Sequence, residues 1–114
     1  MEKNIPKDVP VMAVVITKTK ADGMLTYDAV RRAWKLSEGQ LEKANKAKYV
    51  LAIEDSTVVD IFERHGEFYK DESEEDRYSF LPVPVRGAGI RSRYIGTRYR
   101  SCGQAVIFLG FENV

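Results

Sequence analysis

The stretch YVLAIEDSTVVDIFE, residues 49–63, carries the clearest indication of local structure in the chain. Two runs rich in valine, isoleucine and phenylalanine flank the short polar group EDS. β-branched and aromatic residues on either side of a polar turn are typical of a β-hairpin. We therefore predict two antiparallel strands, residues 49–53 and 57–63, joined by a turn.

Three further segments outside this hairpin have the composition of strands. VPVMAVVIT (residues 9–17) and AVIFLGFE (residues 105–112) are apolar without a helical period, which favours buried strands. RYSFLPVPV (residues 77–85) contains Pro82 and Pro84, which donate no ladder hydrogen bonds and therefore favour an edge strand. The polar stretch HGEFYKDESEED is predicted to form a protruding loop.

Two short helices are predicted before the hairpin. Thr26 can cap the first, and Val30 and Trp34 lie on one helical face. Ser37 and Gln40 have the spacing of a capping box for the second. The second helix has no arginine at its N-terminal end, where a recognition helix presents base-reading side chains, so a DNA-reading helix–turn–helix is not favoured.

This order of elements predicts one α+β domain over residues 1–114. The expected architecture is a small, mostly antiparallel, half-closed β-barrel with the two short helices grouped near the N-terminus. The length of 114 residues suits one core. With 44% apolar and 31% charged residues, and no apolar run near a membrane span or signal peptide, we expect a cytoplasmic protein.

The charge of the chain is unevenly distributed although the formal net charge is only +1. DESEED (residues 71–76) contains five acids in six residues. RGAGIRSRYIGTRYR (residues 86–100) contains five arginines, three glycines and two tyrosines. Such a split can produce a basic face on a nearly neutral protein, or two solvated loops of opposite sign.

The sequence lacks the residues that most kinds of enzymatic catalysis need. One histidine (His65) and one cysteine (Cys102) do not make a zinc cluster, and neither stands in a context typical of a catalytic triad. RYIGT resembles the second half of a GIY-YIG nuclease motif, but the first tripeptide is lacking at the expected distance before it, where only Gly89 and Ile90 stand, and the eighteen residues after Gly96 are too few for the rest of such a domain. We therefore expect neither enzymatic activity nor a metal or other cofactor.

Binding of nucleic acid fits the arginine-rich segment better. Guanidinium groups contact phosphates, tyrosine rings can stack on bases, and glycines allow close approach of the backbone. The alternative is structural: Tyr94 can belong to the core, and Arg91 and Arg93 can pair with DESEED. A second functional hypothesis is a protein–protein adaptor in a nuclease or defence complex, which would use the acidic loop 71–76 and the edge strand 77–85.

The order of motifs resembles bacterial domains of the PUA-like superfamily, including some linked with nucleases or restriction systems. The resemblance is carried by TYDAVRRAWKLS (residues 26–37), KANKAKYVLAIEDSTVVDIFE (residues 43–63), IRSRYIGTRY (residues 90–99) and GQAVIF (residues 103–108). It implies a compact barrel that binds RNA or recognises modified bases in DNA. Among the shared residues, Trp34 can be a stacking platform or an ordinary core indole. The residues expected to bind nucleic acid, from the segment and the resemblance together, are Arg31, Trp34, Arg91, Arg93, Tyr94, Arg98, Tyr99, Arg100 and Gln104.

Overall fold

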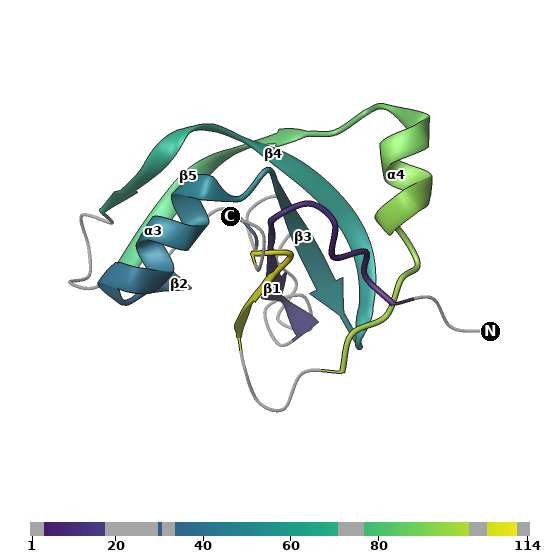
Figure 1. Cartoon of the computed structure of the whole chain (residues 1–114), viewed down its shortest axis with the longest axis horizontal. Helices are drawn as coiled ribbons and strands as arrows, with labels where there is room; N and C mark the ends of the chain where they lie inside the picture. Colours follow the sequence, from purple (N-terminus) through teal and green to yellow (C-terminus); the bar gives the residue numbers. More distant parts are fainter. Residues whose placement is uncertain (1–3, 18–29, 31–33, 71–76, 101–104, 112–114) are drawn as a thin grey trace.

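A computed structural model describes residues 4–17, 30, 34–70, 77–100 and 105–111, and all structural statements below concern these residues. Six strands form one sheet in the order β2-β5-β4-β3-β1-β6. The sheet curls into a half-barrel, and the arched ribbon of β4 and β5 forms its longest part (Figure 1). The elements are β1 (Val11–Val15), β2 (Trp34–Lys35), α3 (Glu38–Lys46), β3 (Tyr49–Glu54), β4 (Thr57–Lys70), β5 (Arg77–Pro84), α4 (Ala88–Tyr94) and β6 (Val106–Leu109).

The prediction of an α+β fold with a half-closed sheet is confirmed, but two of its details are wrong. The sheet is mixed rather than mostly antiparallel, because β1 runs parallel to β3, from Val11 beside Tyr49 to Val15 beside Ile53. A parallel pair needs a long crossover, and the chain between β1 and β3 is long enough to provide one. The described helices are also not grouped near the N-terminus, since α4 follows β5.

The predicted hairpin is confirmed in β3 and β4. Asp55 and Ser56 form its turn with φ angles of 51° and 65°. Two consecutive residues with positive φ are the signature of a type I′ turn, whose twist matches that of the strands it joins. β4 continues to Lys70, so the prediction of a loop for HGEFYK is wrong: pairing with β5 satisfies this backbone, and a register shift between His65 and Tyr69 accommodates Gly66.

The prolines of β5 occupy positions where no donor is needed. The amide of Val85 donates to the carbonyl of Ile61 in β4 at 3.2 Å. Because alternate amides of a strand point in opposite directions, the nitrogens of Pro82 and Pro84 face away from β4. On that outer side β2 pairs with Arg77 and Tyr78, and no other described strand pairs with β5 there, so among the described residues the rest of β5 is an edge, as predicted.

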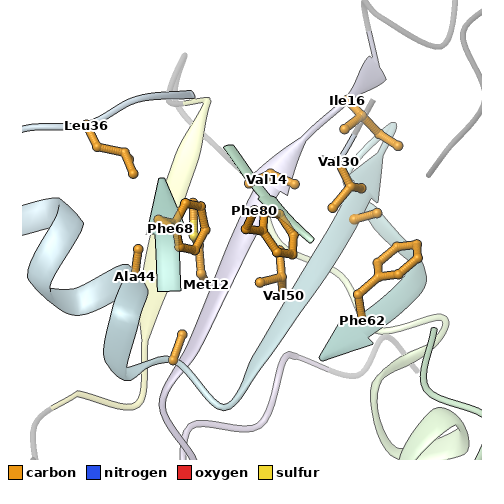
Figure 2. Packing of buried hydrophobic residues seen from close by; sticks show 12 residues of the cluster. Met12, Val14, Ile16, Val30, Leu36, Ala44, Val50, Phe62, Phe68 and Phe80 are labelled. Atoms are coloured by element: carbon orange, nitrogen blue, oxygen red, sulfur yellow. The ribbon is translucent and has the colours of Figure 1, made fainter. Parts of the chain in front are cut away.

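Two apolar clusters cover the two faces of the sheet. The first contains Met12, Val14 and Phe80 and is completed by Ala44 of α3 (Figure 2). The second contains the intervening residues of β1, Val11 and Ala13, and is completed by α4. Ser37 forms the predicted capping box with Gln40 at the start of α3. The two helices therefore cover different faces of one sheet.

Candidate nucleic-acid interface

The arginine-rich segment is a helix followed by an extended strand-like stretch, not the loop predicted from the sequence. α4 ends at Tyr94, and the amide of its C-cap residue Ile95 donates to the carbonyl of Arg91 at 2.8 Å. Gly96 follows with φ +87°, a conformation that costs glycine little and other residues more. This positive φ ends the path of the helix at Gly96. Figure 1 shows the chain leaving α4 as an extended trace.

Residues 97–100 are then fixed beside the start of β4 by backbone hydrogen bonds. The amide of Val58 donates to the carbonyl of Thr97, and the amide of Tyr99 donates to the carbonyl of Ser56, both at 2.9 Å. Arg98 forms isolated β-bridges to Thr57 on one side and to Asn4 on the other. The N-terminal segment, residues 4–8, therefore lies next to residues 97–100.

Alternation along this extended stretch decides which side chains face solvent. Thr97 is buried and Tyr99 is half-buried against the second core cluster. Arg98 and Arg100 are exposed. Because side chains two residues apart in extended chain share a side, the two arginines project together away from the core.

These arginines line two adjoining hollows, which we call together the basic groove. The first, of about 380 Å³, is polar. The second, of about 270 Å³, has apolar and cationic residues in its lining. No aspartate or glutamate is among the described residues that line either hollow. The first is lined by Asn4, Ser56, Arg98 and Arg100, and the second by Asn4, Ile5, Lys7, Arg98, Tyr99, Arg100 and Leu109.

Both arginines of α4, Arg91 and Arg93, form ion pairs with described acids. The guanidinium of Arg91 lies 3.1 Å from the carboxylate of Asp60 and donates to the carbonyl of Val85 at 3.0 Å. Arg93 lies 2.5 Å from Asp8, and this hydrogen-bonded pairing lowers the pKa of Asp8. The structural alternative for these two arginines is therefore favoured, although their partners are Asp60 and Asp8. The acidic stretch 71–76 lies outside the described residues.

The structure buries one of the predicted stacking residues, Tyr94, in the core and packs another, Trp34, against the core. Tyr94 is 1% exposed, its ring lies 5.8 Å from that of Tyr49, and burial raises the pKa of its hydroxyl. Trp34 lies in β2 rather than on a helix, and its indole N–H donates to the carbonyl of Val30 at 2.7 Å. Trp34 packs against the first cluster and Tyr94 belongs to the second, so the sheet separates them. Neither side chain lines the basic groove.

The remaining predicted residues divide between the groove and the undescribed part of the chain. Arg98, Tyr99 and Arg100 come together in the groove. Arg31 and Gln104 lie outside the described residues.

Sequence reasoning missed Asn4, Lys7 and Ser56, which belong to the same groove. No local pattern marks them, because the N-terminal segment and the β3–β4 turn meet residues 97–100 only through the fold.

No family model, curated protein or solved structure matches this chain. Within the described ranges, no three histidine, cysteine, aspartate or glutamate side chains gather where they could hold a metal ion. Neither of the helices described, α3 or α4, has the length and apolar character needed to cross a membrane.

Proposed function

We propose that this chain is a non-enzymatic nucleic-acid-binding domain whose contact surface is the basic groove. The observation that carries the proposal is the lining of the groove: Lys7, Arg98 and Arg100 converge there without a carboxylate among the described lining residues. Phosphate neutralisation by lysine and arginine supplies most of the affinity of non-specific nucleic-acid binding. That the chain is a PUA-like domain, as the resemblance of its sequence motifs implies, remains part of this proposal.

The backbone around the groove is held in place before any ligand arrives. Residues 97–100 are bonded to β4 on one side and bridged to Asn4 on the other. A site that needs little ordering on binding loses less conformational entropy than a flexible loop. The two exposed arginines offer planar forks of donors that match phosphate oxygens, and Asn4 and Ser56 add neutral hydrogen-bonding groups.

The proposed contact set is smaller than the set predicted from the sequence. Arg98, Tyr99 and Arg100 are kept, with Tyr99 offering only the part of its ring that the core leaves exposed. Arg91, Arg93, Tyr94 and Trp34 are left out because none of them lines either hollow. Contacts from Arg31 and Gln104 remain predictions.

The test is binding of labelled single- and double-stranded RNA and DNA over a salt series. In the double variant Arg98→Gln and Arg100→Gln, two phosphate contacts are lost, and the slope of log affinity against log salt should fall by about 1.4–1.8 in magnitude. The matched control is Lys46→Gln with Lys70→Gln, which removes the same charge at the C-terminal ends of α3 and β4, from residues that line neither hollow. Equal slopes for both double variants would contradict the proposal.

A second candidate function, a protein–protein adaptor, has support from β5. Leu81 and Val83 are each 44% exposed and lie opposite His65 and Glu63 of β4. Strand addition at this edge is disfavoured, because Pro82 and Pro84 remove two outward donors, so docking would use the exposed face. Replacing Leu81 and Val83 by serine should abolish partner capture in a pull-down while nucleic-acid affinity stays unchanged. Loss of nucleic-acid affinity instead would count against the adaptor.

A further inference from the structure

The second hollow of the basic groove combines two kinds of surface. Ile5, Tyr99 and Leu109 give it an apolar part, and Ile5 is only 3% exposed. Lys7, Arg98 and Arg100 supply three positive charges in the same space of about 270 Å³. A hollow of this size lies near the lower limit of small-molecule sites, about 300 Å³, so it suits one nucleotide-sized group rather than a length of chain.

The charge of this hollow exceeds what one internal phosphate of a nucleic acid requires. An internal phosphodiester carries one negative charge, so cations that follow a continuous strand are spread along its backbone. Here three lining cations gather around one hollow. A phosphate monoester carries a charge of about −1.5 to −2 at neutral pH and three strong acceptor oxygens, which fits this concentration of donors better.

Among the described residues, the acid nearest in the chain to this hollow is Asp8. Asp8 directly follows Lys7, but its carboxylate pairs with Arg93 at 2.5 Å. One arginine of α4 therefore holds the carboxylate that stands next to Lys7 in the chain.

We infer that the second hollow binds the phosphorylated end of a nucleic acid, with the terminal phosphate monoester against Lys7, Arg98 and Arg100. The apolar part, with Tyr99, takes the sugar or base of the terminal nucleotide. This inference rests on the proposed function and narrows it from nucleic acid in general to chain ends. Lys7 is the discriminating residue, because it lines the second hollow and not the first.

The experiment compares three single-stranded oligonucleotides of one sequence, carrying a 5′-phosphate, a 3′-phosphate or hydroxyl groups at both ends. One phosphorylated form should bind about tenfold more tightly than the hydroxyl form, since hydrogen bonds between charged groups are stronger than those between neutral groups. This preference should shrink below about pH 6, where the monoester takes up its second proton while lysine and arginine stay charged. Competition by a nucleoside monophosphate distinguishes a free nucleotide from a chain end as the source of the phosphate.

Lys7→Gln should remove the preference and also lower the affinity for all three oligonucleotides, because one cation of the groove is lost. The control Lys46→Gln should keep both the preference and the affinity. Equal affinity for all three oligonucleotides overturns this inference and leaves the proposed function standing. Absence of binding to any of them overturns both. A preference that survives in Lys7→Gln also overturns the assignment to the second hollow.

Discussion

Replacing Gly110 by alanine should destabilise the protein more than the same change at Gly66. Both glycines have φ +80°, so both alanine variants adopt the left-handed conformation that costs an L-residue about 1–2 kcal/mol. At Gly66 nothing lies within 4 Å of a Cβ atom, so strain of the backbone angle is the main cost. At Gly110 a Cβ would lie 2.3 Å from the carbonyl oxygen of Val9 and 2.8 Å from its carbonyl carbon.

That overlap cannot be relieved by a side-chain rotation, because both clashing atoms belong to the backbone. The segment that holds Val9 has to move, and forced shifts in a packed region cost about 1–3 kcal/mol. The free energy of unfolding of Gly110→Ala should therefore fall by about 2–5 kcal/mol, which adds this cost to the left-handed strain. The gain from stiffening the unfolded chain is common to both variants and cancels in the comparison.

The assay is urea unfolding of the wild type and both variants, followed by the fluorescence of Trp34. Gly110→Ala should lose at least about 1 kcal/mol more than Gly66→Ala, the lower limit of the cost of the forced shift. Equal losses at the two positions would refute the reasoning, since they would mean that the close approach of Val9 to Gly110 costs nothing to relieve. The carbonyl of Lys7 also lies 3.1 Å from that Cβ, so Gly110→Ala should weaken nucleic-acid binding in the groove as well.

Three further predictions concern α4 and its partners. Arg91→Met should lower the free energy of unfolding by about 1–2 kcal/mol, because it leaves the carboxylate of Asp60 without its guanidinium partner, and denaturant titration measures the change. Arg93 lowers the pKa of Asp8 below its ordinary value of 3.8, so the stabilisation from this pair is present above that value and is lost as pH falls through the lower folded pKa; acid titration of Asp8→Asn should lack this component. Tyr94→Phe should be neutral or stabilising by up to about 1 kcal/mol in thermal unfolding, because the buried hydroxyl has no hydrogen-bond partner in the described structure, and a clear loss of stability would contradict that.

Local features of the sequence were sufficient to predict the hairpin of β3 and β4 and the first residue of α3. The turn at Asp55 and Ser56 and the capping box of Ser37 depend on residues within a few positions of one another, so their chemistry can be read directly. HGEFYK was misassigned because its polar side chains suggested a loop, whereas backbone pairing with β5 decides its conformation. The parallel pairing of β1 with β3 likewise depends on a long crossover, and no residue of either strand indicates this pairing in the sequence.

The candidate site was also predicted only in part from the sequence. Its arginines form one run in the sequence, but they have two different surroundings in the fold. Arg91 and Arg98 are alike in charge and in local surroundings, but Asp60 lies opposite the first and the N-terminal segment lies beside the second. Gly96 separates them: its positive φ ends the path of α4 and begins an extended stretch in which arginine alternates with core residues. The density of charge in the sequence was therefore enough to predict a basic segment. The groove could not be predicted in this way, because it also depends on where the fold places the N-terminal segment and the start of β4. If the groove binds nucleic acid, charge-removing substitutions in α4 should reduce stability first, and those at Arg98 and Arg100 should reduce affinity first.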